Sequence, residues 1–152
     1  MSNAVVGQSD GDPVALFSQV PAEMTFQAAP GVWPMVLGML PPPCRVLDIG
    51  AGRGGLSWIL DRCGYEVSPV DLHPEHFLAP DLQCLQANAQ ESIPFADRSF
   101  DLIVAVEIIE HLENPWKFLR ECLRVLRDDG QLIITSPNVT TLMSRLTFLL
   151  TG

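Results

Sequence analysis

Short apolar runs alternate with amphipathic stretches along most of the chain. Short segments with apolar residues, bounded by turn residues, predict strands at 44–49, 66–71, 82–86, 100–106 and 131–135. The run at 100–106 is almost unbroken, as in strands that are buried on both faces. Apolar residues spaced three or four apart predict helices at about 54–63 and 115–127, with short helical segments within 17–40 and around 74–78. A last, strongly apolar stretch predicts a helix at 138–150.

Strands that alternate with helices predict a parallel sheet, because parallel neighbours must be joined by right-handed crossovers. Capping residues support the boundaries: Asn114 and Pro115 suit a helix start, and Gly64 suits a helix end. With 152 residues, the chain has the length for one core. We therefore predict an α/β, Rossmann-like doubly wound parallel sheet in one domain over residues 14–152, after a disordered tail at 1–13.

A glycine-rich turn joins the first predicted strand to the next helix, in the segment Asp-Ile-Gly-Ala-Gly-Arg-Gly at 48–54. Gly50, Gly52 and Gly54 allow a tight turn and a close approach of backbone to a ligand, at the start of a helix. Together with Gly55, the first two also satisfy the dinucleotide pattern G-x-G-x-x-G. The segment therefore predicts a cofactor-binding turn.

Two carboxylates near this turn narrow the choice of cofactor. Asp48 ends the first strand, where a pyrophosphate would be repelled, whereas the sulfonium and ammonium groups of S-adenosylmethionine would be attracted. Asp71 ends the second strand, about 20 residues after the turn, where a carboxylate can accept hydrogen bonds from both ribose hydroxyls. The pattern favours a methyl donor over a dinucleotide.

At this point the chain resembles the class I S-adenosylmethionine-dependent methyltransferases over roughly residues 30–150. The order and spacing of five segments carry the resemblance: Asp48 to Gly54, Asp71, Ile93 to Asp101, Glu107 to His111, and Gly130 to Asn138. Among members, those that act on small or quinone-like molecules are the most similar. The resemblance implies strand order 3-2-1-4-5 and a helix within 17–40 that partly covers the cofactor.

The family's sheet usually ends in an antiparallel hairpin that supplies a sixth and a seventh strand, and no such segment follows Gly152. We therefore expect the domain to be incomplete at its C-terminus. The fifth strand would then be an open edge, and the helix at 138–150 would expose apolar residues to water. A homodimer through that helix and that edge is the expected consequence, and weak or absent methyl transfer is expected with it.

The resemblance also implies a set of cofactor-binding positions. Asn88 stands where members commonly have an adenine-binding aspartate, the Ala89 amide would donate to the ring, and Val106 and Glu107 would pass beneath the methionine end. The complete set expected to bind the cofactor is Asp48, Gly50, Ala51, Gly52, Gly54, Asp71, Leu72, Asn88, Ala89, Val106 and Glu107.

Glu107, Glu110 and His111 would share one helical face if their segment is helical. Some members with a similar Glu-x-x-Glu-His bind a divalent ion there, but a further histidine usually comes from later in the chain, and none follows His111. We therefore expect no metal. His111 is the candidate general base for an acceptor that must lose a proton.

Composition limits the partners and the compartment. Nine basic against eighteen acidic residues give a net charge of −9, which disfavours nucleic acid and anionic membrane surfaces. No apolar run reaches the eighteen residues of a membrane span. Four cysteines without Cys-x-x-Cys spacing, and no secretory signal, indicate free thiols in a reducing cytoplasm.

The function expected is therefore methyl transfer from S-adenosylmethionine to a small-molecule or lipid acceptor, with S-adenosylhomocysteine as the product. A non-catalytic module that binds the same cofactor is the alternative. An NAD-dependent oxidoreductase is disfavoured by Asp48 and by the lack of a Tyr-x-x-x-Lys pair, since Tyr65 and Lys117 are the sole tyrosine and lysine. The sequence does not identify the acceptor.

Overall fold

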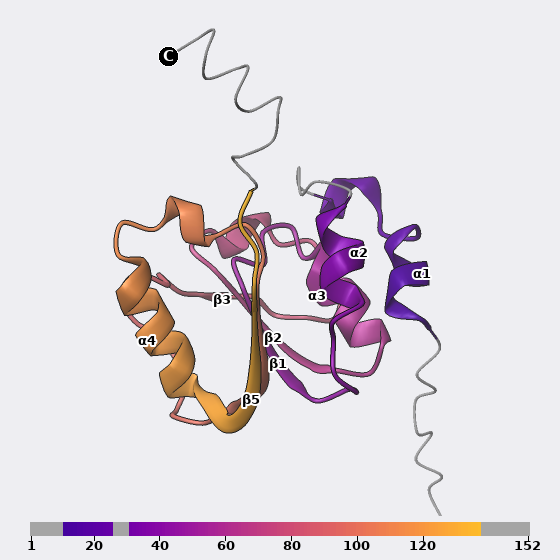
Figure 1. Ribbon diagram of the computed structural model, residues 1–152. Helices are drawn as coiled ribbons and strands as arrows, with labels where there is room; N and C mark the ends of the chain where they lie inside the picture. The colour runs from indigo at the N-terminus through magenta and orange to yellow at the C-terminus, as the bar shows by residue number, and fades with distance from the viewer. Residues whose placement is uncertain (1–10, 26–30, 138–152) are drawn as a thin grey trace, which may run out of the picture.

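The computed structural model describes residues 11–25 and 31–137, and these residues form a parallel five-stranded sheet (Figure 1). The strand order β3-β2-β1-β4-β5 and the parallel pairings confirm the predicted fold class and order. The strands are β1 (Arg45–Ile49), β2 (Glu66–Asp71), β3 (Leu85–Gln86), β4 (Phe100–Ala105) and β5 (Leu126–Ile134).

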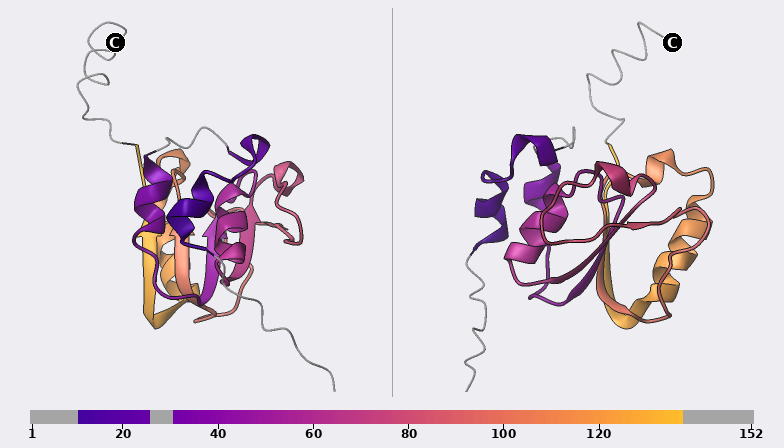
Figure 2. Two further views of the ribbon diagram at one scale, coloured as in Figure 1. Left: turned by 90° about the vertical axis from the view of Figure 1, so that its right-hand side faces the viewer. Right: turned by 180° about the vertical axis from the view of Figure 1, so that it is seen from behind.

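Helices cover both faces of the sheet. One face carries α1 (Pro13–Phe17), α2 (Val32–Leu37) and α3 (Gly55–Arg62), and the other carries α4 (Pro115–Val125), as Figures 1 and 2 show from three sides. Successive residues of β1 serve the two faces: Val46 belongs to the core under α2 and α3, and Leu47 to the core under α4. The central strands β1 and β4 are thus buried on both sides, which explains why most of their residues are apolar.

The start of β5 and the end of α4 differ from the predicted boundaries at Gln131 and Arg127. α4 ends at Val125 because Leu126 is extended and buried, and it pairs with Phe100 of β4. The next pairing joins Gln131 to Leu102, so the residues between bulge out of the ladder. The polar run 127–130, which was not predicted as part of a strand, is therefore an irregularity within β5.

Predictions at the two ends of the chain fall mainly outside the described residues. The expected tail over 1–13 overlaps the first helix, since Asp12 caps α1 by accepting a hydrogen bond from the Val14 amide, and residues 1–10 are not described. The helix expected at 138–150 is not described either. Among the helices that the structure describes, none has the length and apolar character needed to cross a membrane.

The carboxyl ends of the strands meet at one edge of the sheet. β1 leads there into the turn before α3, β2 ends in Asp71, and β4 leads into a 3₁₀ helix, η3 (Ile109–His111). Two more short 3₁₀ helices lie in the connections, η1 (Ala22–Met24) and η2 (Pro74–His76). This edge is where ligands bind in open parallel sheets.

Candidate functional site

Two cavities, of about 400 Å³ and about 290 Å³, lie at this edge. Four residues line both cavities, so they form one cleft with a larger and a smaller lobe: Gly50, Val106, Glu107 and His111. Together the lobes have a volume suited to a nucleoside-sized ligand.

The cleft gathers eleven of the twelve residues that the sequence proposed for binding or catalysis. Besides the four shared residues, the larger lobe contains Asp48, Ala51 and Gly52. The smaller lobe contains Asp71, Leu72, Asn88 and Ala89. These residues come from three strand ends and the loop after β3.

Gly54 is the exception, because it lines neither lobe. A Cβ atom there would lie 2.7 Å from the Phe77 ring and 2.9 Å from the Ala79 side chain. Its φ of +86° also disfavours any other residue. Gly54 is therefore needed for packing against the segment after η2, and its expected contact with the cofactor stays a prediction.

Gly52 has the opposite surroundings. Its φ is +54°, and the nearest atom to a Cβ built on it would be the Gly50 carbonyl oxygen at 3.9 Å. The missing side chain would thus point into open space at the larger lobe. The turn therefore leaves room for a ligand to approach the backbone at Gly52.

The amide groups of the turn are already hydrogen-bonded within the protein. The Gly50 and Ala51 amides donate to the Val70 carbonyl oxygen at 2.9 and 3.1 Å. The Gly52 amide donates to Asp71 Oδ2 at 2.8 Å. These three amides are engaged by β2, so the turn is preorganised but does not offer them to a pyrophosphate. This arrangement favours a cofactor without phosphate groups.

Asp71 also accepts a hydrogen bond from the His73 amide, through Oδ1 at 2.8 Å. Each carboxylate oxygen therefore has one backbone partner and one further lone pair. Since Asp71 is partly exposed and lines the smaller lobe, both oxygens keep capacity for ligand hydroxyls. The carboxylate joins the glycine turn to that lobe.

Asp48 is 2% exposed, and its Oδ2 accepts a hydrogen bond from Ser57 Oγ at 2.5 Å. Burial raises the pKa of Asp48 to about 6; the Ser57 hydrogen bond lowers it, and the Asp71 charge raises it. Ser57 lies within the buried face of α3, where a polar residue had not been singled out by the sequence pattern. The larger lobe thus has a buried anion in its lining.

Asn88 is engaged in its own turn. Its Oδ1 accepts from the Gln90 amide at 3.0 Å, and its Nδ2 donates to Glu91 at 3.1 Å. The side chain therefore stabilises the loop, and only the second lone pair of Oδ1 is left for a ligand. Ala89, which is 8% exposed, lies beside it in the smaller lobe.

The segment after β4 is not one continuous helix, so Glu107 does not share a helical face with Glu110 and His111. Glu107 has a φ of +53°, and its amide donates to Thr135 Oγ1 at 3.0 Å. Within η3, His111 Nε2 and Glu110 Oε1 are 4.0 Å apart. All three residues line the larger lobe, but no set of three or more His, Cys, Asp or Glu among the described residues could hold a metal ion.

The larger lobe is also lined by residues that were not proposed as site residues, among them Met24, Trp33 and Arg53. Arg53 Nη1 donates to the Glu23 carbonyl oxygen at 3.0 Å, which links the glycine turn to η1. Trp33 is buried on α2, in the helix expected to cover the cofactor. Their apolar or arginine side chains gave no local signal for a site, since only the fold brings them there.

Comparisons with known proteins identify the family of the chain. Residues 47–134 match a family model described as a methyltransferase domain. A probable S-adenosylmethionine-dependent methyltransferase of Mycobacterium tuberculosis is 35% identical over 116 residues, covering 70% of this chain and 42% of the relative. A ubiquinone biosynthesis O-methyltransferase of Xanthomonas campestris is 33% identical over 108 residues, covering 65% and 45%.

Solved structures show the same fold. A Pyrococcus horikoshii protein aligns with a TM-score of 0.66 at 26% identity, over 75% of this chain and 58% of its own. An Archaeoglobus fulgidus methyltransferase described as SAM-dependent aligns with a TM-score of 0.65 at 24% identity, over 92% and 60%. The chain spans less than half the length of these two curated relatives. Because the family model covers more than half of the chain, the protein belongs to the S-adenosylmethionine-dependent methyltransferase family.

Proposed function

We propose that the two-lobed cleft binds S-adenosylmethionine and that the domain transfers its methyl group to a small-molecule acceptor. The observation that carries the proposal is the surroundings of Asp48. Its buried carboxylate is hydrogen-bonded to a neutral hydroxyl, and the ionisable neighbour that shifts its pKa is another carboxylate, Asp71. A ligand with a sulfonium and an ammonium group supplies the positive charge that such a site favours.

The residues of each lobe fit a different part of this cofactor. Asp48, Ala51 and Gly52 would surround the methionine part in the larger lobe. Asp71 and Leu72 would hold the ribose, and Asn88 and Ala89 the adenine, in the smaller lobe. Gly50, Val106 and Glu107 line both lobes and would pass beneath the centre of the cofactor.

S-adenosylmethionine supplies an already activated methyl group, so the protein mainly aligns the partners and excludes water. His111 lies where the lobes meet, with most of its side chain exposed, and it would accept the proton of an acceptor hydroxyl or amine. Some relatives are named for ubiquinone biosynthesis, which supports a quinone-like or other small acceptor here.

Isothermal calorimetry with S-adenosylhomocysteine and with NAD tests the cofactor assignment. We expect S-adenosylhomocysteine to bind with one site per chain and NAD to give no heat of binding at the same concentrations. The reverse preference would overturn the proposal in favour of a dinucleotide enzyme. Methyl transfer to hydroxyl and amine acceptors is then measured by mass spectrometry. Cofactor binding without transfer to any of these acceptors would favour the non-catalytic module.

The remaining expectations belong to the same proposal. Residues 14–152 would form one domain, and the free thiols of Cys44, Cys63, Cys84 and Cys122 suit the reducing cytoplasm.

Within the described residues β5 is an edge strand, which supports a homodimer through that edge and the segment that follows. Light scattering at micromolar concentration should give twice the mass of one chain, and a monodisperse monomer would contradict the dimer.

A further inference from the structure

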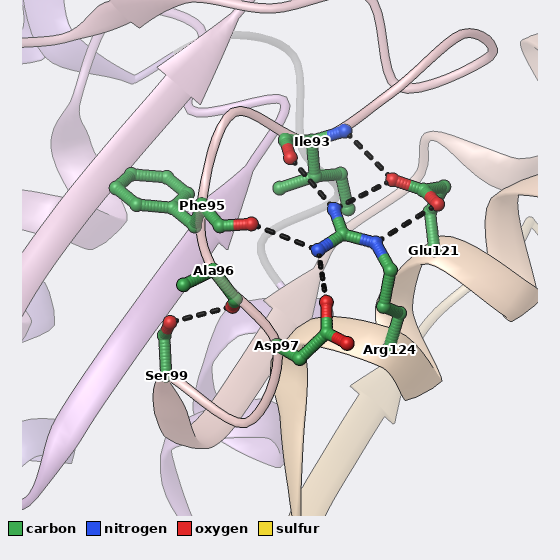
Figure 3. Close-up of polar contacts among 7 residues, drawn as sticks. All are labelled: Ile93, Phe95, Ala96, Asp97, Ser99, Glu121 and Arg124. Atoms are coloured by element: carbon green, nitrogen blue, oxygen red, sulfur yellow. Dashed lines mark hydrogen bonds and ion pairs between the residues drawn. The ribbon is translucent and has the colours of Figure 1, made fainter.

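Arg124, near the end of α4, holds the loop between β3 and β4 with all three nitrogens of its guanidinium group (Figure 3). Nε and Nη2 donate to the two carboxylate oxygens of Glu121, at 3.1 and 2.8 Å. Nη1 donates to the Phe95 carbonyl oxygen and to Asp97 Oδ1, both at 2.8 Å, and Nη2 also donates to the Ile93 carbonyl oxygen at 2.9 Å. A planar fork of donors suits this pattern, whereas a lysine ammonium does not.

Ile93 is fixed through its amide, its carbonyl oxygen and its side chain. Its amide donates to Glu121 Oε2 at 3.0 Å, while its carbonyl oxygen accepts from Arg124. Its side chain is 2% exposed and belongs to the core under α4. Hydrogen bonds to charged groups are stronger than neutral ones, so Glu121 and Arg124 together fix this point of the backbone to the helix.

The same loop begins as the wall of the smaller lobe. Asn88 and Ala89 line the lobe, and the Glu91 and Ser92 amides donate back to the Asn88 carbonyl oxygen at 2.9 and 3.2 Å. One compact turn therefore connects the lobe to Ile93. A further hydrogen bond holds this turn: the Glu113 amide, just before α4, donates to Gln90 Oε1 at 2.6 Å.

We propose that Arg124 is a positioning residue for the adenosine half of the cofactor: by holding Ile93 and Phe95 to α4, it sets the place of Asn88 and Ala89 in the smaller lobe. This inference rests on the proposed function. Arg124 lines neither lobe, so its effect passes through the loop backbone. Loss of the fork leaves two carbonyl oxygens without their charged donor and lets the turn at 88–92 move away from the ligand.

The test compares Arg124→Lys with Arg127→Lys as a matched control. Arg127 lies just beyond α4 and pairs with Asp101 and Asp129, at 3.3 and 3.7 Å from its Nε, away from both lobes. Both changes keep the charge, and the first removes the fork that holds the loop. Dissociation constants for S-adenosylhomocysteine and for methylthioadenosine are measured by calorimetry at a temperature where thermal unfolding shows each variant fully folded.

We expect Arg124→Lys to raise the dissociation constants of both ligands about fivefold and by the same factor, because both contain the adenosine group. Arg127→Lys should leave both constants within about twofold of wild type. A lowered unfolding midpoint with unchanged dissociation constants would overturn the proposal, since the residue would then support the fold alone. If the wild-type chain bound neither ligand, the proposed function would fail with it.

Hydrogen exchange on the wild-type chain gives a second measurement in case Arg124→Lys does not fold. Coupling between the loop and the ligand is reciprocal, so S-adenosylhomocysteine should slow exchange in a peptide covering 93–97 as well as in one covering 87–92. Slower exchange confined to 87–92 would overturn the proposal.

Discussion

Asp48 is the residue at which stability and binding oppose each other. Its pKa is raised from 3.8 to about 6, first by burial, so the folded state holds the proton more tightly than the unfolded state. Folding stability therefore falls as the pH rises from about 3.8 to about 6 and then stays level. The pKa difference of about two units corresponds to a loss of roughly 3 kcal/mol of folding free energy above pH 6.

Asp48→Asn should remove this cost. The amide oxygen of asparagine can still accept the Ser57 hydrogen bond, and no charge is buried. Urea denaturation should show a free energy of unfolding raised by up to roughly 3 kcal/mol at pH 8 and little changed at pH 4. Calorimetry at pH 8 should show at least about tenfold weaker binding of S-adenosylmethionine, because the cationic ligand loses its anion. Equal stabilisation at both pH values would show that the carboxylate is not the cause.

Asp71 has a structural role besides the one expected in ligand binding. Its carboxylate was expected to bind ribose, but it also accepts the Gly52 and His73 amides. Asp71→Ala should weaken S-adenosylhomocysteine binding at least about tenfold through lost charged hydrogen bonds. Asp71→Asn keeps one acceptor oxygen and is the milder comparison.

If both Asp71 variants bind within about threefold of wild type in the same titration, the ribose role is wrong. A thermal melt of each variant shows how much of the lost affinity comes from a destabilised glycine turn, whose Gly52 amide has lost its carboxylate acceptor. The carboxylate itself could be found from the sequence, because its distance from the glycines follows the β-α-β repeat. The hydrogen bond from the Gly52 amide could not, since it depends on how β1 and β2 are aligned.

At the scale of elements, the turn between β1 and α3 makes the sharpest prediction. Gly52→Val adds a side chain in the left-handed region, directed at the open space of the larger lobe. Gly64→Val adds the same strain at a φ of +86°, after α3 and on neither lobe. Both variants should lose stability, but only Gly52→Val should abolish S-adenosylhomocysteine binding in calorimetry. If Gly52→Val kept its affinity for S-adenosylhomocysteine, the ligand would not bind against the turn.

Element types followed from the sequence more readily than element ends. β2 begins and ends where predicted, because Gly64 and Asp71 mark its limits. The end of α4 was misplaced because the amphipathic pattern continues past Val125, while the burial of Leu126 against β4 forces an extended backbone. For a similar reason, the sequence could not decide whether Glu107 lies on a helix: its amide makes a long-range hydrogen bond to Thr135 that no local pattern encodes.

At the scale of the whole molecule, the parallel sheet was predictable from alternation alone, while the order of the strands came from the family resemblance. The order decides that β1 and β4 are neighbours, and hence that Asp48 and Glu107 face one cleft. Contacts such as Arg124 with Ile93 join residues 31 positions apart and follow from that order. The sequence could therefore name the residues of the cleft, but not the side chains that hold its walls.

The central claim is that one cofactor occupies both lobes at the carboxyl edge of the sheet. Amide chemical shifts of the ¹⁵N-labelled chain, recorded with and without saturating S-adenosylhomocysteine, test it most directly. The account predicts large shift changes at Gly50 and Gly52 in one lobe, together with Asn88 and Ala89 in the other. Changes confined to one lobe, or centred on residues outside the cleft, would contradict it.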